Sequence, residues 1–428
     1  MRTFFVLSLP LSLSLSFSVV GCASDWQARY DLLGAALAPP RVPSEPLEGL
    51  AALVYSAVRT HPRVLQARAK AEAAMARAGG AGSLDDPMLF LKTDSTPFGT
   101  GGGDPVRSAG LSQTFALGKL GPRSDIALAE AGKEVEEYRR AVNDIAAEVR
   151  RAWADYAIAL KEREIHNRHA ELMKAFIDVA ETKYSNGKVS QQDVLEGRSG
   201  AAMIHVSLTE TSSNLEAARA LIVELTGLEP PAPVLHPKAL TIPLDRVLEI
   251  AAASRPELRR AQREIARAEA AQTLASRERW IPDITAEVEY LQMPSEDDAF
   301  AATLGFNLPW FSPARKAAET AAARELDAAK LGLEAERRSV TREVTAAWHK
   351  LKSALASYET FTKDLVPRGE QTLEVARTNY EKDRVDFLRF LKAEQDLRTV
   401  ELEAARAAAR VELAWADLER ATGADLRR

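Results

Sequence analysis

The chain has 428 residues, of which 46% are hydrophobic, 27% charged and 6% aromatic, and its formal net charge is −5. This length is enough for two or three ordinary domains or for one elongated domain. Basic residues are interspersed with acidic ones throughout the chain, so nucleic acid is not expected as a partner.

The first 21 residues have the pattern of a signal peptide. Arg2 supplies a thin positive region, and the apolar run after it is too short to be a membrane-spanning helix. The run ends at Val-Val-Gly-Cys, and Cys22 is the only cysteine of the chain. A lone cysteine at this place resembles the bacterial lipobox, so Cys22 is predicted to be acylated and to begin an N-terminal linker, 22–46. The alternative is an ordinary secretory signal with an incidental cysteine.

Two further features bear on where the protein resides. Ala23 and Ser24 follow the cysteine with no aspartate at the second position, which for bacterial lipoproteins favours delivery to the outer membrane. No stretch after residue 22 reaches the roughly 20 apolar residues of a membrane helix. If the chain crosses a membrane, it must therefore do so with strands.

The first predicted unit covers residues 47–228. It begins with a helix over Leu47–Arg77, followed by two short strands in PMLFLKTDS and VRSAGLSQTFAL. A helix of about 60 residues, roughly 90 Å long, then runs from Ser124 to Tyr184. A turn at Ser185-Asn186-Gly187 leads into a return helix that ends at Thr226-Gly227, because Asn186 and Gly187 readily adopt the left-handed conformation of a turn.

The second predicted unit, 244–425, repeats the first after a proline-rich linker, 229–243. THPRVLQARAKAE at 60–72 matches SRPELRRAQREIA at 254–266, and EVRRAWADY at 148–156 matches EVTAAWHKL at 343–351. Tyr184 matches Tyr380, and the order of landmarks is the same in both copies. The second unit should therefore hold a helix over 244–279, two strands and a long hairpin that turns at Glu381, Lys382 and Asp383.

The strands of the second unit alternate with a period of two, which predicts one apolar and one polar face. The apolar side carries Ile284, Val288 and Tyr290 in one strand and Phe300, Leu304 and Phe306 in the next. The polar side includes Glu287 and Glu289. Four strands cannot close a barrel alone, and an open edge in lipid leaves backbone groups unpaired, so several chains sharing one barrel are favoured over a small soluble sheet.

This duplicated plan of helix, two strands and long hairpin resembles the TolC-type outer-membrane factor family. HPRVLQA and RPELRRA near the repeat starts, LSQTFALGKLGPR after the strands and YSNGKVSQQDVLEG at the turn carry the resemblance, which covers about residues 45–425. It implies a mainly α fold with a small β part, in which duplicated hairpins form an α-barrel. A homotrimer would complete a twelve-stranded transmembrane β-barrel in outer-membrane lipid, with Phe115 and Phe306 facing the lipid.

The resemblance further implies an efflux channel that works with a periplasmic adaptor (membrane fusion) protein and an inner-membrane pump. Its cargo would be small molecules or metal ions. The alternatives are the outer-membrane channel of a type I protein secretion system, or a periplasmic coiled-coil adaptor or scaffold lipoprotein. Adaptors carry one hairpin between split lipoyl-like halves, so two hairpins fit them poorly.

The hairpin turns of this family form the periplasmic entrance, which makes the residues near them gate candidates. Asp193 and Glu196 share one face of the return helix, and the matching positions of the second copy are Arg389 and Lys392. Carboxylates are usual at those second-copy positions, so this chain departs from the family. We expect Asp193 and Glu196 to pair with Arg389, Lys392 or the Tyr380 hydroxyl of the adjoining hairpin; the alternative is that these charges only keep the turn soluble.

No motif supports an enzyme, and no cofactor is expected. GTGGGDP lacks the Lys-Ser/Thr of a phosphate-binding loop. Glu162, His166 and His169 have spacings that could hold a metal, but a solvated helix face is the preferred interpretation, and no metal site is predicted. Trp153 and Trp348 are expected to pack between neighbouring helices.

Overall fold

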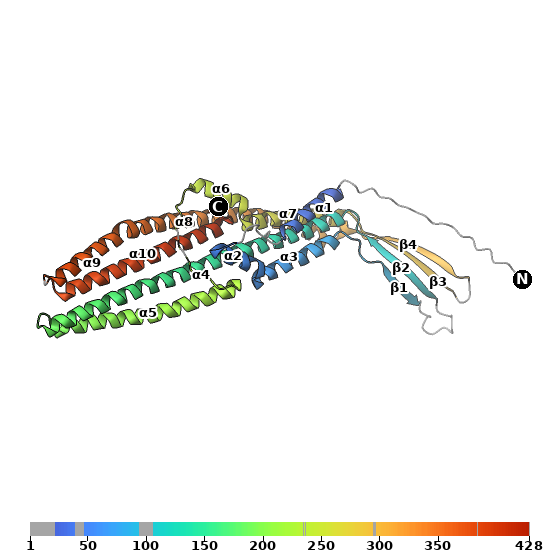
Figure 1. Cartoon of the computed structure of the whole chain (residues 1–428). Helices are drawn as coiled ribbons and strands as arrows, with labels where there is room; N and C mark the ends of the chain where they lie inside the picture. The colour runs from blue at the N-terminus through green and yellow to red at the C-terminus, as the bar shows by residue number, and fades with distance from the viewer. Residues whose placement is uncertain are drawn as a thin grey trace.

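The computed structural model describes residues 22–38, 47–93, 106–233, 235, 237–293, 297–382 and 384–427. The predicted signal peptide and Asp383 lie outside these residues. The molecule is elongated, with its strands at one end and the turns of its two long hairpins at the other (Figure 1).

The two halves of the chain have the same order of elements. The first half contains α1 (Cys22–Ala36), α2 (Gly49–Thr60), α3 (Pro62–Gly80), β1 (Met88–Thr93), β2 (Arg107–Phe115), α4 (Leu120–Ser185) and α5 (Gln191–Thr226). The second half contains α6 (Leu244–Ser254), α7 (Pro256–Trp280), β3 (Ile284–Gln292), β4 (Ala299–Phe306), the 3-10 turn η1 (Pro309–Phe311), α8 (Pro313–Thr360), the π-helical segment η2 (Phe361–Leu365), α9 (Val366–Glu381) and α10 (Phe387–Thr422).

The prediction of single helices over 47–77 and 244–279 was wrong. Each is broken, at His61 between α2 and α3 and at Arg255 between α6 and α7. Both residues precede a proline and have extended backbone angles, with φ of −65° and ψ of 130° and 119°. The proline ring excludes the helical conformation from the residue before it, so each helix ends and a new one starts.

The described strands form one antiparallel sheet in the order β1-β2-β3-β4, so strands of both halves meet at β2 and β3. The predicted faces are confirmed. Phe115, Ile284 and Phe306 lie opposite one another across three strands, and Glu287 lies opposite Thr303 on the other face. On that polar face Lys92 of β1 forms an ion pair of 3.0 Å with Glu287 of β3, which links these two strands across β2.

The long helices are confirmed. α4 has 66 residues, which corresponds to about 99 Å at 1.5 Å per residue. Gly187 adopts the predicted left-handed conformation with φ of 69°, and Gly227 and Gly423 end α5 and α10 with φ of 70°. Among the described residues, no helix is both long and apolar enough to cross a membrane.

The second hairpin differs from the first in one respect that the repeat did not predict. The helix that leads to its turn widens to a π-helix over Phe361–Leu365, and Pro367 follows two residues after the end of this segment. Proline lacks the amide hydrogen and its ring clashes with the carbonyl four residues earlier, so a wider turn relieves the contact. The corresponding helix of the first hairpin, α4, is regular throughout.

The helices form a single curved layer. Toward the tips, α5 packs on α4, α4 on α10, and α10 on α8 and α9; toward the sheet, α3 packs on α4, α4 on α7 and α7 on α8. Trp153 is buried in the core of the first half, as predicted. Trp348 donates to the carbonyl of Ile242 at 3.1 Å and Trp415 to that of Lys238 at 3.0 Å, so two indoles fasten the linker to the helices.

Candidate functional site at the hairpin tips

The turns of the two hairpins lie side by side at the end of the molecule opposite the strands (Figure 1). A buried apolar cluster near them joins the α4–α5 hairpin to the α9–α10 hairpin. Its aromatic members are Phe176 of α4, Tyr380 of α9 and Phe387 and Phe390 of α10. The rings of Phe176 and Phe390 stack with centroids 3.7 Å apart. The two tips of one chain are therefore held together by a core of their own.

Gly197 of α5 makes room for this cluster. A Cβ atom there would lie 3.1 Å from Phe387 Cζ and 3.1 Å from Ile177 Cγ1. Such contacts are tighter than side chains normally tolerate, so a larger residue would push Phe387 out of the cluster or move α5.

Tyr380, predicted as a gate residue, is buried with an exposed fraction of 1%. The Lys183 ammonium group lies 4.2 Å from the centre of its ring and donates a hydrogen bond to its backbone oxygen. Lys183 precedes the first turn and Tyr380 precedes the second, so this contact ties the two turns together.

Asp193 has a local structural role that was not predicted. Its carboxylate accepts from the backbone N–H of Ser190 at 3.2 Å, while the Ser190 hydroxyl accepts from the backbone N–H of Asp193 at 3.3 Å. This capping box starts α5. The spacing of serine and aspartate in Ser-Gln-Gln-Asp was a signal for it.

The other gate candidates also contact near neighbours. Glu196 accepts from the Gln192 amide at 2.8 Å, Lys392 pairs with Asp396 at 2.6 Å, and the Arg389 backbone N–H donates to Asp386, which caps α10. Among the described residues of one chain, no ion pair joins Asp193 or Glu196 to Arg389 or Lys392.

The interpretation of His166 and His169 as part of a solvated helix face was wrong. Their exposed fractions are 7% and 1%, because α10 covers this side of α4. Both nitrogens of His169 face glutamates of α10. The sequence spacing within α4 gave no sign of these partners, which lie more than 220 residues away in the chain. Among the described residues, no group of three or more His, Cys, Asp or Glu side chains is arranged to hold a metal ion.

The elongated helical layer, the small sheet and the paired tips can be compared with known proteins. Residues 53–228 and 247–424 match the family described as outer membrane efflux protein. The chain belongs to this family. As an outer membrane efflux protein it resides in the outer membrane, and its long helices form the periplasmic extension.

Two relatives show how far the similarity extends. The cobalt-zinc-cadmium resistance protein CzcC of Cupriavidus metallidurans is 25% identical over 266 residues, which cover 59% of this chain and 62% of CzcC. The match thus spans less than two thirds of that relative's length. VceC, an outer membrane protein of Vibrio cholerae, superposes with a TM-score of 0.74 over 88% of this chain and 96% of VceC at 18% identity.

A third comparison supports the same fold. A membrane protein from Pseudomonas aeruginosa superposes with a TM-score of 0.77 over 90% of this efflux protein and 99% of its own chain, again at 18% identity. The predicted fold, with TolC-like duplicated hairpins and four strands per chain, is therefore confirmed.

Proposed function

We propose that this protein is the outer-membrane channel of a tripartite efflux system and that it works as a homotrimer. The observation that carries the proposal is that one chain ends in open edges on both sides. β1 and β4 each pair with only one described strand, and the helical layer begins with α5 and ends with α8 and α9. An open sheet edge in lipid leaves backbone groups without hydrogen-bond partners, which is strongly unfavourable. The outer strands β1 and β4 therefore require strands of neighbouring chains.

Exposed apolar side chains on the edge helices support closure by further copies. Leu195, Met203 and Val206 of α5 are 53%, 64% and 50% exposed, and Val375 of α9 is 61% exposed. A layer with exposed apolar side chains on helices at both of its edges is suited to closing on itself through copies in a ring. Three chains would supply twelve strands and six hairpins.

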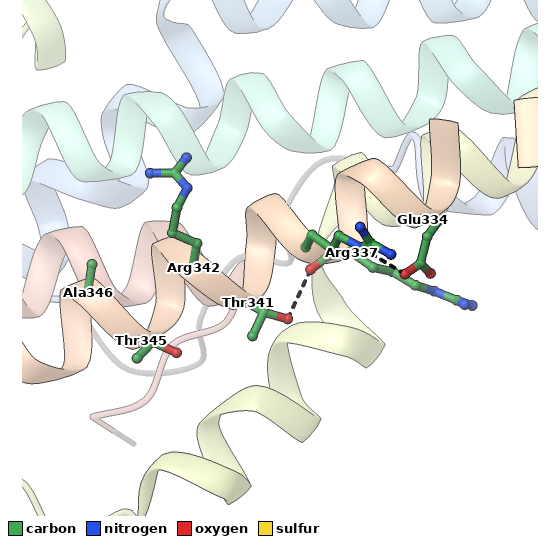
Figure 2. Close-up of a pocket in the computed structure, with 7 residues that line it drawn as sticks. Glu334, Arg337, Thr341, Arg342, Thr345 and Ala346 are labelled. Carbon is green, nitrogen blue, oxygen red and sulfur yellow. Dashed lines mark hydrogen bonds and ion pairs between the residues drawn. The ribbon is translucent and has the colours of Figure 1, made fainter. Parts of the chain in front are cut away.

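A shallow, solvent-open hollow on α8 is a candidate for contact with a neighbouring chain. It measures 680 Å³ and is lined by α8 alone, including Arg337, Thr341 and Arg342 (Figure 2). The Thr341 hydroxyl donates a hydrogen bond to the Arg337 carbonyl within the same helix at 2.9 Å. Arg337 and Arg342 are exposed on the surface of α8. We infer that the adjoining chain of the trimer provides the opposite wall.

The cargo that we propose is small molecules or metal ions, delivered by a periplasmic adaptor and an inner-membrane pump. The printed name of CzcC, a cobalt-zinc-cadmium resistance protein, supports metal ions as one class. We propose a channel and no catalytic role, because the matched family and the superposed structures are outer membrane channels.

We also propose that Cys22 is acylated. α1 begins at Cys22, and one turn later Trp26 donates to the carbonyl of Ser124 at 3.5 Å. Ser124 lies in the first turns of α4, directly after the strands. An acyl chain at the start of α1 would thus lie near the membrane end of the molecule, as an anchor requires.

The gate that we propose lies between chains. Asp193 and Glu196 on α5 and Arg389 and Lys392 on α10 would face the adjoining hairpin of a neighbouring chain, with the turn residues Asn186, Gly187 and Lys382 at the rim. Exposed ion pairs contribute only about 0–1 kcal/mol each. Threefold repetition would hold the entrance closed and still allow an adaptor to open it.

The test combines mass and conductance. Light scattering of the purified protein in detergent should give a trimer, and the same sample should form discrete channels in planar bilayers. A stable monomer with intact strands, or a trimer without conductance, would contradict the proposal. Sensitivity of a deletion strain to cobalt, zinc and cadmium salts, compared with its sensitivity to hydrophobic drugs, would identify the cargo class.

A further inference from the structure

The least expected feature of the helical layer is a histidine buried between two carboxylates. His169 Nδ1 lies 2.9 Å from Glu394 Oε1, and His169 Nε2 lies 2.8 Å from Glu401 Oε2. The exposed fractions of these three residues are 1%, 0% and 9%. His169 belongs to the first hairpin and both glutamates belong to the second, so one imidazole bridges the hairpins.

The contacts depend on protonation. A protonated imidazole donates from both nitrogens, whereas a neutral one donates from one nitrogen and presents a lone pair at the other. After loss of the proton, a carboxylate oxygen would therefore face a lone pair at less than 3 Å in a buried place. Removing one charge from a buried pair is strongly unfavourable for the partner that remains.

We propose that His169, Glu394 and Glu401 form a proton-binding site that clamps the two hairpins of a chain together. With the proton bound, both hydrogen bonds join α4 to α10. Without it, one of the two becomes repulsive and the hairpins are free to separate along this stretch. The inference concerns contacts inside one chain and does not depend on what the channel conducts.

The surrounding charges make Glu394 the more dependent partner. Glu401 also accepts from Arg168 of α4 at 2.5 Å, so it keeps a cation when His169 is neutral. Glu394 has only Arg398 nearby, at 3.9 Å, and its second oxygen is buried with no hydrogen-bond partner in the described structure. Loss of the His169 proton would therefore leave Glu394 poorly compensated.

Other titratable and charged groups lie around the site, and the Nδ1 atom of one of them, His166, is buried with no hydrogen-bond partner in the described structure. One turn before His169 lies His166, and Glu162 of α4 pairs with Arg406 of α10 at 2.8 Å. From α9, Glu370 lines the same cleft as Arg168 and Glu401. No hydrogen bond or ion pair of the described residues links α5 to the site.

A route for the proton is present. A cleft of 510 Å³ beside the site is lined by Arg168, Glu401, Tyr358 and Glu370, and residues Pro233 and Leu235 of the linker form part of its wall. Glu401 is the member of the site that borders this cleft, so it connects the buried imidazole with solvent.

The electrostatics agree with this geometry. Burial lowers the pKa of the His169 imidazole, but the hydrogen bonds with Glu394 and Glu401 and their charges outweigh burial, so the pKa is raised. Burial raises the pKa of Glu401, but the hydrogen bond with His169 and the Arg168 charge outweigh it, and the pKa is lowered. For His166 the pKa is lowered, first by burial and then by the Arg398 charge.

The sign of the pH dependence follows from these shifts. Stabilisation by His169 is complete below the unfolded value of about 6.5 and is lost as pH rises through the raised folded value. Stabilisation by Glu401 is present above its unfolded value of about 4.3 and is lost as pH falls through the lowered folded value. The clamp thus holds below the raised pKa of His169 and opens as pH rises through it.

The first experiment measures the site in the wild-type protein. Hydrogen–deuterium exchange at the imidazole C2 position, followed by mass spectrometry over a pH series, gives a separate titration midpoint for each histidine. The midpoint of His169 should lie above that of His166. Glu401→Gln and Glu394→Gln should each lower the His169 midpoint, whereas Glu181→Gln, which changes a glutamate of α4 that pairs with Arg198 near the turn, should not.

The second experiment measures the clamp. Thermal unfolding of the intact protein should show a loss of stability as pH rises through the His169 midpoint. His169→Gln should remove this loss, and the control His205→Gln, at an exposed position of α5, should retain it. A His169 midpoint at or below that of His166, or parallel stability profiles for wild type and His169→Gln, would overturn the proposal. Conductance of the channel enters neither experiment, so the proposed function can fail while the clamp stands.

Discussion

Phe387 fills the space that a side chain at Gly197 would need, and it does so from the other hairpin of the same chain. The Cβ position of Gly197 lies 3.1 Å from the Phe387 ring. The two hairpin tips can therefore pack this closely because residue 197 has no side chain. Gly197→Leu should lower the stability of the tip region by about 1–3 kcal/mol through overpacking.

Gly200, one turn further along α5, supplies the matched control. A Cβ atom at Gly200 would lie 3.5 Å from Leu391 Cδ1, which is an ordinary van der Waals contact. Gly200→Ala should thus gain up to about 1 kcal/mol from helix propensity. Urea unfolding followed by hydrogen exchange of the tip helices measures both effects. Equal behaviour of the two variants would show that Phe387 does not depend on Gly197.

Phe306 tests the orientation of the sheet. It is 65% exposed and shares the apolar face with Ile284 and Phe115. Phe306 is the last residue of β4, near one edge of the membrane band, so Phe306→Arg would place a charge toward lipid there and should weaken trimer assembly by up to about 1 kcal/mol. Thr303→Arg changes the opposite face of the same strand and should assemble normally. Heat-modifiable mobility on gels reads out assembly, and normal trimers of the Phe306 variant would reverse the assignment of the faces.

Cys22→Ser tests the anchor. Radiolabelled palmitate should be incorporated into the wild-type protein and not into the variant, since the thiol is the acceptor. We expect the variant to retain partial activity, because the strands still hold it in the membrane. Labelling that survives the substitution would rule out the lipobox interpretation.

The gate is tested by replacing charges on both hairpins. Asp193→Ala together with Arg389→Ala should raise single-channel conductance and sensitise cells to large antibiotics, because pairs between chains would be lost. Asp193 also belongs to the capping box of α5, so Ser190→Ala is needed as a control. That variant weakens the cap by about 0.5–2 kcal/mol and keeps the carboxylate. If it raises conductance as much as the double variant does, the effect comes from the helix start and the charges are not a gate.

Much of the fold could be predicted because it depends on local sequence patterns, such as the alternation of apolar residues and the positions of glycines. Alternation at 284–290 and 300–306 predicted the sheet faces, and the glycines at 187 and 227 predicted the turn of the first hairpin and the end of its return helix. The helix breaks at His61 and Arg255 were not predicted, because the effect of a proline on the residue before it was neglected. The second hairpin was predicted as a copy of the first, and the effect of Pro367 on its helix was overlooked.

The candidate site was less accessible to prediction, because its contacts join residues distant in the chain. His169 has the spacing of a surface residue on α4, and only the packing of α10 makes it a buried bridge between Glu394 and Glu401. Likewise, Tyr380 matched Tyr184 in the repeat, yet Tyr184 is 47% exposed and Tyr380 is buried. When the two copies pack against each other, equivalent positions acquire different neighbours. The sequence pattern within one copy does not contain those contacts.

The linker that Trp348 and Trp415 hold against the helices has a consequence for symmetry. Six identical hairpins could form a ring with sixfold symmetry and would have to share every substitution. Covalent joining fixes the two copies in strict alternation, so a ring of three chains has threefold symmetry and two classes of position. The residues of each class could then diverge independently. Three differences between the two copies are of this kind: the π-helix before Pro367, the charges at the equivalent positions Asp193 and Arg389, and the bridge from His169. Fusion of the two copies in one chain keeps such differences at fixed places around the ring.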